Sequence, residues 1–192
     1  MRVIAGDKKG HQLKAVPGTT SRPTTDKVKE AVFQSMGPFF SGGLCLDLFA
    51  GSGSLGMEAL SRGMEKAVFV DKSPKAIHTI HENLRTLQLE PRAEVFRTDA
   101  YRALQAAGKR GLQFDLILFD PPYKKVDYRK FLHKIVMQQL INPNGVIYCE
   151  HDATERMPDV LEHLSIIKQE NYGGTIGITV YHALTDYNPL TE

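Results

Sequence analysis

Two prolines stand between a carboxylate and an aromatic ring at Asp120, Pro121, Pro122 and Tyr123, directly after the apolar run FDLILF. Because prolines fix φ and cannot continue a strand, the chain must leave a sheet here in a rigid turn. The Asp120 carboxylate and the Pro121 carbonyl can accept both N–H groups of an amino group on a planar base, which frees the nitrogen lone pair, while Tyr123 stacks on the base. The motif predicts group transfer to an amino nitrogen without a metal, although a bare tetrapeptide also occurs as a strand-ending turn.

A glycine-rich segment, DLFAGSGSLG, places Gly51, Gly53 and Gly56 in G-x-G-x-x-G spacing, with Asp71 twenty residues after Gly51. Such glycines let the backbone turn sharply and approach a ligand, and an acid after the next strand can accept bonds from ribose hydroxyls. The pattern fits dinucleotide oxidoreductases and S-adenosylmethionine enzymes equally. A tight turn without a ligand is the third interpretation.

The charge around this loop separates the two cofactors. Asp47, Asp71, Asp99 and Asp120 stand at or just past the ends of the first four expected strands, which is the edge where doubly wound sheets bind ligands. An acidic edge repels a pyrophosphate, whereas S-adenosylmethionine carries an ammonium and a sulfonium against one carboxylate. The acids therefore favour S-adenosylmethionine, with helix capping as the competing role, above all for Asp99.

The elements that position these residues alternate from residue 44 onward between short apolar runs and helical patterns, which is typical of βαβ units in an α/β fold. Ile77 and Leu84 belong to one face of a helix over Lys75–Leu87. A second helix precedes residues 142–145, which are expected to stop it, and the Gly173–Gly174 turn makes the last two strands antiparallel. The expected strands are 44–48, 67–71, 93–97, 114–119, 145–149, 164–169 and 175–182.

The first 40 residues follow a different pattern. Two short strands, Arg2–Ile4 and Gln12–Ala15, are expected to form a hairpin, and a helix with Val28, Val32 and Met36 on one stripe follows. Nothing resembles a linker. We predict a single domain over residues 1–192, with an N-terminal extension over 1–40 and a catalytic core over 41–185.

Composition limits the class of protein. Residues 1–30 carry seven Lys and Arg against three Asp and Glu, whereas the rest carries 17 against 19, so the positive charge gathers at the front, as suits a polyanion or an ordinary solvated face. Cys45 and Cys149 are expected to be core thiols, and His78 and His81 surface residues, not metal ligands. No apolar run approaches a membrane span, and no secretory signal is visible, so we expect a cytoplasmic protein.

Together these segments resemble the class I S-adenosylmethionine-dependent N-methyltransferases, and more narrowly the bacterial 16S ribosomal RNA guanine-N2 methyltransferases of the RsmD type. The resemblance extends over essentially the whole chain. It rests on RVIAGDKKGHQL, SRPTTDKVKEAVF, DLFAGSGSLGMEALSRG, FVDKS and FDLILFDPPY. It implies a Rossmann-like methyltransferase fold with a seven-stranded, mostly parallel sheet and an antiparallel C-terminal strand, preceded by the short N-terminal β-hairpin and helix.

The resemblance also implies roles for individual residues. Gly51 and Gly53 would pass under the methionine part of the cofactor, Asp47 would lie near its ammonium, Asp71 would bind the ribose and Asp99 would face the adenine. Asp120, Pro121, Pro122 and Tyr123 would hold the target guanine. The implied cofactor-binding set is Asp47, Phe49, Ala50, Gly51, Gly53, Asp71, Lys72, Asp99, Ala100, Thr24 and Thr25, and the implied RNA-binding set is Arg2, Lys8, Lys9, Lys14 and Arg22.

The expected partner is 16S rRNA in an assembled or partly assembled small subunit, bound by a monomer without a metal or a membrane. Three other functions stay open. The chain could be an amino-methyltransferase acting on DNA adenine or on another RNA or protein amide. It could be a nicotinamide oxidoreductase, which would leave Asp47 and the D-P-P-Y motif unexplained. A non-catalytic RNA-binding assembly factor would need only the basic front.

Overall fold

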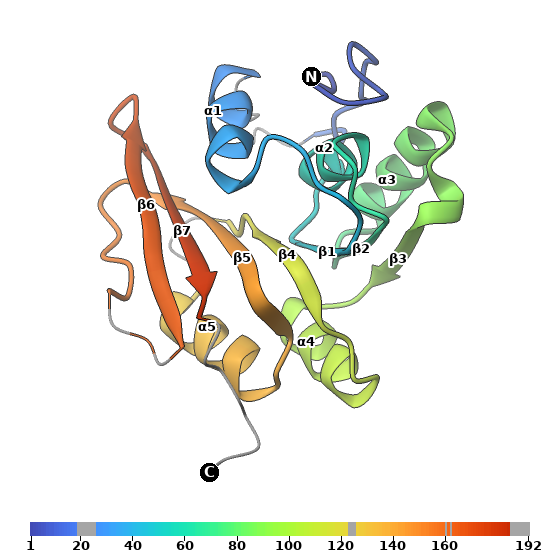
Figure 1. Cartoon of the computed structure of the whole chain (residues 1–192). Coiled ribbons are helices and arrows are strands. Elements are labelled where there is room, and N and C mark those ends of the chain that lie inside the picture. Colours follow the sequence, from blue (N-terminus) through green and yellow to red (C-terminus); the bar gives the residue numbers. More distant parts are fainter. Residues whose placement is uncertain (19–25, 123–125, 160, 162, 185–192) are drawn as a thin grey trace. The chain divides into compact units, whose positions relative to one another are not determined.

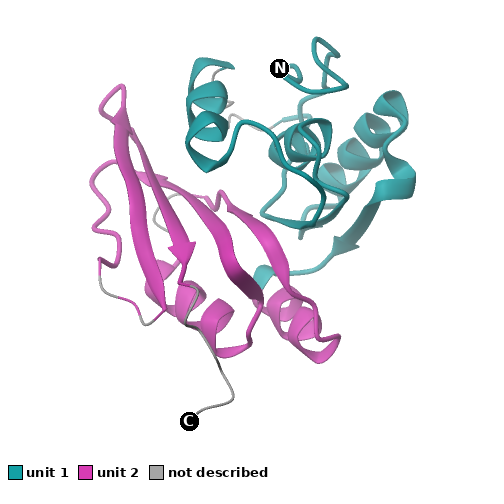
Figure 2. Ribbon diagram, in the orientation of Figure 1, with its two compact units in different colours: residues 1–100 teal, residues 101–192 magenta. Residues whose placement is uncertain are grey.

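The computed structural model describes residues 1–18, 26–122, 126–159, 161 and 163–184 of the 192-residue chain (Figure 1). The chain consists of two compact units, residues 1–100 and residues 101–192 (Figure 2). Each unit holds strands and helices. The prediction of one domain with an extension over residues 1–40 stays a prediction.

Unit 1 is built around three parallel strands in the order β3-β2-β1. Leu44 pairs with Lys66 and Ala67 pairs with Ala93 at the start of the two ladders. Every residue of β1 after Leu44 is buried, so this strand lies in the core of the unit. The elements of unit 1 are α1 (Asp26–Met36), β1 (Leu44–Leu48), α2 (Ser54–Ser61), β2 (Lys66–Asp71), α3 (Pro74–Leu87), a 3-10 turn (Glu90–Arg92) and β3 (Ala93–Arg97).

Helix α3 confirms the predicted amphipathic helix and shows why it begins and ends where it does. The Ser73 hydroxyl accepts the N–H of Ala76, Pro74 occupies the first helical position, and Gln88 closes the helix in a left-handed conformation. Ile80 and two leucines of the predicted stripe are buried, whereas Ile77 is half-buried. The buried residues of α3 are Ala76, Thr79, Ile80, Asn83, Leu84 and Leu87.

The predicted N-terminal hairpin is only partly formed. Arg2 and Gln12 make one isolated antiparallel bridge, with no continuous strand on either side. The N–H groups of Ile4 and Ala5 donate to the carboxylate of Glu58, at 2.8 and 3.0 Å. Backbone hydrogen bonds on both sides of the bridge continue the pairing from Met1 to Val3, whereas the amides of Ile4 and Ala5 turn to Glu58.

Unit 2 contains four strands in the order β4-β5-β7-β6. Strand β4 is parallel to β5, and β7 is antiparallel to both β5 and β6, which confirms the antiparallel C-terminal pair. Helix α5 begins after Asp127, whose carboxylate accepts the N–H of Lys130. The elements are α4 (Ala100–Lys109), whose first residue belongs to unit 1, β4 (Phe114–Phe119), α5 (Tyr128–Met137), β5 (Ile141–Asp152), β6 (Leu164–Tyr172) and β7 (Ile176–Ala183).

The prediction that residues 142–145 stop a helix was wrong. Helix α5 already ends at Met137, and residues 142–145 lie inside β5. They form an irregularity in the ladder, because Phe114 pairs with Ile141 whereas Leu116 pairs with Val146. A proline and a glycine are tolerated there since the extra residues bulge out of the pairing.

The remaining predictions about the core can be compared directly. The described residues form seven strands where seven were expected, with β1, β3 and β4 at the predicted bounds. Cys45 and Cys149 are free and buried, as predicted. In the described part of the chain, no helix combines the length and the apolarity that a membrane span requires, and no three His, Cys, Asp or Glu side chains gather into a metal-binding group.

Candidate active site

The loop between β1 and α2 turns through left-handed backbone at three residues, namely Phe49 (φ 60°), Gly51 (φ 55°) and Gly53 (φ 78°). The N–H of Ala50 anchors this loop by donating to the carbonyl of Val70 at 2.9 Å. A left-handed conformation costs a non-glycine residue such as Phe49 about 1–2 kcal/mol. The fold therefore holds this loop in a shape that the sequence does not favour locally, as is common at binding sites.

Asp47 lies beneath the glycine loop, not at the surface. Its side chain is buried, and its carboxylate accepts the N–H of Gly56 in the first turn of α2 at 2.9 Å. A Cβ on Gly56 would overlap the ring of Phe69 and come within 2.9 Å of the Asp47 carboxylate. Burial, opposed by the Gly56 hydrogen bond and aided by the charge of Asp71, raises the pKa of Asp47 to about 7.

Asp71 ends β2 and connects the two sides of the loop. One carboxylate oxygen accepts the N–H of Gly51 at 2.9 Å and the other accepts the N–H of Ser73 at 2.8 Å. Each oxygen has a second lone pair, so the same carboxylate can also accept ligand hydroxyls. Lys72, the next residue, is exposed.

The surface above the loop suits the predicted cofactor. No atom lies within 4 Å of the position that a Cβ would occupy on Gly51, so the backbone there can be approached closely. Gly53 caps α2 without any side-chain hydrogen bond, which leaves N–H groups of the first helical turn for other acceptors. An open loop beside the acidic end of β2 fits a ligand that carries hydroxyls, a carboxylate and positive charge.

Asp99 and Ala100 follow β3, as the sequence predicted. Asp99 is half-buried in the residue before α4, and Ala100 is the first residue of that helix and is buried. This position fits both interpretations from the sequence, a contact with a ligand and a residue at the start of a helix.

Asp120 stands in unit 2 where the buried strand β4 ends. Its side chain is half-buried, Pro121 is buried and Pro122 is exposed. The preceding residue, Phe119, packs edge-on against Tyr128 at 5.5 Å between ring centroids. Tyr123 lies outside the described residues, as do Arg22, Thr24 and Thr25, so their predicted roles stay predictions.

The basic front differs from residue to residue. The guanidinium of Arg2 pairs with Asp26 at 2.8 Å, and the ammonium of Lys14 pairs with Glu82 at 2.7 Å. Lys9 is exposed and Lys8 is half-buried, and in the described residues neither makes an ion pair. The charges most available to a polyanion are therefore those of Lys8 and Lys9.

Comparison with known proteins decides the family. A family model described as "Conserved hypothetical protein 95" matches residues 1–182. The "Putative rRNA methyltransferase YlbH" of Bacillus subtilis is 51% identical over 181 residues, which are 94% of this chain and 98% of the relative. "Ribosomal RNA small subunit methyltransferase D" of Haemophilus influenzae is 32% identical, over 90% of this chain and 89% of its own. The chain belongs to the RsmD family of ribosomal RNA methyltransferases.

Solved structures with the same fold support this family assignment. The "Putative methyltransferase yhhF from Escherichia coli" has a TM-score of 0.82 and 28% identity, and covers 97% of this chain and 99% of its own. A "conserved hypothetical protein" from Streptococcus pyogenes has a TM-score of 0.77 and 36% identity, with 84% of this chain and 98% of its own covered. The predicted class I methyltransferase fold is confirmed, and relatives named as methyltransferases support S-adenosylmethionine as the cofactor.

Sequence reasoning missed a buried ionic cluster of unit 1, formed by Lys29, Glu58 and Arg62. The Glu58 carboxylate accepts Arg62 Nε at 2.8 Å and lies 3.4 Å from Lys29 Nζ. Lys29 Nζ also donates to the backbone oxygen of Arg2 at 2.6 Å and to the hydroxyl of Ser54 at 3.1 Å. Burial lowers the pKa of Lys29, although Glu58 opposes the shift. The cluster thereby ties the N-terminal segment and α1 to the first residue of α2.

Proposed function

We propose that this RsmD-family protein transfers the methyl group of S-adenosylmethionine to the exocyclic N2 of a guanine in 16S rRNA, within an assembled or partly assembled small subunit. The position of Asp120 carries the proposal. Its half-buried carboxylate follows the buried strand β4 directly and precedes a buried proline. Relatives named for methylation of the small-subunit rRNA support the substrate.

Each cofactor-binding residue proposed in unit 1 contacts a different part of S-adenosylmethionine. Asp71 accepts the ribose hydroxyls with the lone pairs that the Gly51 and Ser73 amides leave free. The backbone at Gly51 and Gly53 lies under the methionine part, and Asp47 supplies negative charge below it. Asp99 faces the adenine. When bound, S-adenosylmethionine supplies an electrophilic methyl group on a positively charged sulfur.

Asp120 and Pro121 prepare the amino group for attack. The amino nitrogen of guanine is a weak nucleophile because its lone pair is delocalised into the ring. When the Asp120 carboxylate and the Pro121 carbonyl accept its two N–H groups, the nitrogen becomes pyramidal and the lone pair points at the methyl carbon. This nitrogen would accept the methyl group that the sulfonium would release, and Asp120 would accept the proton that the nitrogen then loses.

The RNA is proposed to reach the site along the basic N-terminal segment. Arg2, Lys8, Lys9, Lys14 and Arg22 would contact phosphates, which position an RNA but do not read its sequence. The exposed, unpaired charge of Lys9 supports this role better than the charges of Arg2 and Lys14, which face carboxylates. We expect the protein to act as a monomer in the cytoplasm.

The test compares the methylation kinetics of two variants, one at Asp120 after β4 and one at Asp115 within β4. Labelled S-adenosylmethionine is incubated with small subunits from cells that lack this protein, and with free rRNA and DNA. Asp120→Asn should lower kcat by about 10²–10³-fold, because a charged acceptor is replaced by a neutral amide that cannot take the proton, while the affinity for S-adenosylmethionine is kept. Asp115→Asn, an exposed residue of the same strand, is the matched control and should leave kcat unchanged.

Other outcomes would identify the rival functions. Label in DNA adenine or in a protein amide would keep the cofactor and the reaction class but replace the substrate. Binding of NADH in place of S-adenosylmethionine would favour a nicotinamide oxidoreductase. A protein that supports subunit assembly equally well with Asp120→Ala would be a binding factor and not an enzyme.

A further inference from the structure

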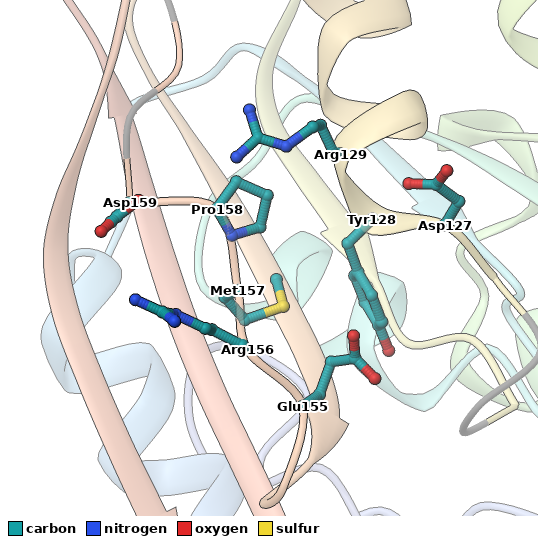
Figure 3. Close-up of a pocket in the computed structure, with 8 residues that line it drawn as sticks. All are labelled: Asp127, Tyr128, Arg129, Glu155, Arg156, Met157, Pro158 and Asp159. Carbon is teal, nitrogen blue, oxygen red and sulfur yellow. The ribbon is translucent and has the colours of Figure 1, made fainter.

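Unit 2 contains a cavity of about 450 Å³, a volume within the range of small-ligand sites. It opens between the first turn of α5 and the segment that follows β5, so all of it belongs to unit 2 (Figure 3). None of the catalytic, cofactor-binding or RNA-binding residues predicted from the sequence lines this cavity. The lining residues are Asp127, Tyr128, Arg129, Glu155, Arg156, Met157, Pro158 and Asp159.

Both walls of the cavity are fixed by buried hydroxyls. The Tyr128 hydroxyl donates to the backbone oxygen of Glu150 at 2.9 Å, which holds the first turn of α5 against β5. The Tyr181 hydroxyl donates to the backbone oxygen of Pro158 at 2.7 Å, and this holds the opposite wall against β7. Met157 and Pro158 are buried. The cavity is therefore formed in the absence of any ligand.

Two exposed guanidinium groups stand beside these anchors, Arg129 next to Tyr128 and Arg156 next to Met157. Figure 3 shows them on opposite walls. Over the described residues, neither arginine forms an ion pair, although Asp127, Glu155 and Asp159 line the same cavity. The arginines therefore keep their donors for a ligand.

The mixture of charges narrows the chemistry of that ligand. Each arginine suits a phosphate, which it can bind with paired N–H donors. Asp127, Glu155 and Asp159 would repel a bare phosphate, but their carboxylates can accept N–H groups from a nucleobase. Met157, Pro158 and Tyr128 add an apolar surface. A nucleotide combines all three features, whereas an inorganic anion has only the first.

The cavity also adjoins the motif that ends β4. Tyr128 lines the cavity on one side and packs against Phe119, the neighbour of Asp120, on the other. Burial raises the pKa of Tyr128, and the nearby carboxylates of Asp120 and Glu155 add to the shift. Tyr128 thus connects the cavity to the end of β4, where the motif begins.

We propose that this cavity binds a nucleotide adjacent to the target guanine in the RNA, with Arg129 and Arg156 on the phosphates that flank it and Glu155 and Asp159 on the N–H groups of its base. The inference rests on the proposed function and extends it, because it names residues that select the sequence or shape around the target. Such contacts add binding free energy beyond the reacting base and fix its position.

The first test measures methylation kinetics of small subunits with the full chain carrying Arg129→Gln and Arg156→Gln together. The KM for subunits should rise about tenfold with kcat unchanged within about twofold, and the slope of log KM against log salt should fall by about 1 to 2. Arg110→Gln, an exposed arginine of unit 2 outside the cavity, is the control. A double variant with the KM and salt slope of the wild type would overturn the proposal.

A second test needs no methyl transfer. The arginine Nε–H signals of the full chain, saturated with S-adenosylhomocysteine, are followed by NMR during addition of guanosine or adenosine 5′-monophosphate, or of inorganic phosphate. Shifts of Arg129 and Arg156 with the nucleotides, larger than with phosphate, support a nucleotide site. Equal shifts with phosphate, or none, overturn it. If the wild type transfers no methyl group to RNA, the proposed function fails, and this titration still decides the cavity.

Discussion

At the scale of single residues, Asp47 shows how burial changes what a side chain can do. The sequence places it four residues before Gly51, and the structure hides it under the loop with the Gly56 N–H as its partner. Its pKa of about 7 leaves it partly protonated near neutral pH. A cation bound beside it would favour the ionised carboxylate and lower that pKa.

This placement predicts a pH dependence of cofactor binding. The affinity for S-adenosylmethionine should rise about tenfold between pH 6 and pH 8, because at the lower pH binding must expel a proton from Asp47. The complex then holds fewer protons than the free protein, so affinity increases with pH and levels off above 7. Calorimetry over this range measures it, and Asp47→Asn should remove this part of the slope. Parallel profiles for both proteins would place Asp47 away from the ammonium.

Gly51 offers a second prediction, with a matched control in unit 2. Gly51 and Gly111 have similar left-handed φ values of 55° and 62°, and neither has an atom within 4 Å of a Cβ position. Alanine at either site should lower the free energy of unfolding by about 1–2 kcal/mol, through backbone strain alone. Only Gly51→Ala should also weaken S-adenosylmethionine binding, by tenfold or more. Equal affinities in both variants would show that no ligand approaches Gly51.

The residues that sequence reasoning identified are those whose type is demanded by the backbone or by the reaction. Glycines at tight turns and the acids at the ends of β1, β2 and β4 carry a local pattern, so they could be found without a structure. Lys29, Glu58 and Arg129 carry none, because their roles depend on partners far away in the sequence. A charged residue inside an apolar helical stripe, such as Lys29 beside Val28 and Val32, was the available signal.

At the scale of elements, the cluster of Lys29, Glu58 and Arg62 joins α1, α2 and the N-terminal segment. Glu58→Gln should lower the free energy of unfolding by about 3–5 kcal/mol, because two buried cations lose their counter-charge. Glu30→Gln removes the exposed partner of Arg62 and should cost less than about 1 kcal/mol. Urea unfolding of both variants tests this. Similar small losses would mean that the cluster contributes little to the fold.

The lysines of the N-terminal segment should differ in how much they contribute to binding of small subunits. Changing Lys8 and Lys9 together to glutamine should weaken binding of small subunits and reduce the salt dependence by about 1 to 2 in log–log slope. Lys14→Gln should have a smaller effect, since its ammonium already pairs with Glu82. Filter binding at several salt concentrations measures both. Identical losses would contradict the assignment of free charge to Lys8 and Lys9.

Helices and strands were predicted well where the spacing of apolar residues and the length of the segment indicated the same element, as in α3 and β4. The prediction failed at residues 142–145, where proline and asparagine signals indicated a helix stop but the chain bulges within β5. It also overstated the length of the N-terminal hairpin, because Glu58, a residue 53 positions away from Ala5, takes the amides that follow Val3. In both cases a distant partner outweighed the local signal.

At the scale of the whole molecule, the alternation of strands and helices predicted an α/β fold, and the resemblance of the motifs implied its methyltransferase form, which comparison along nearly the full chain confirms. The base that is methylated is not encoded in that alternation. Fold and cofactor loop are shared by enzymes with many substrates, so the target depends on surfaces such as the N-terminal segment and the cavity of unit 2.

The central claim, methyl transfer to the N2 of a guanine in 16S rRNA, is tested most directly by the chemical identity of the product. Small subunits from cells that lack the protein are incubated with S-adenosylmethionine and the wild-type chain, and the rRNA is digested to nucleosides for mass spectrometry. We predict one new N2-methylguanosine per subunit, strongly reduced with Asp120→Asn. Methylated adenosine, a guanosine methylated elsewhere, or unchanged rRNA would contradict the account.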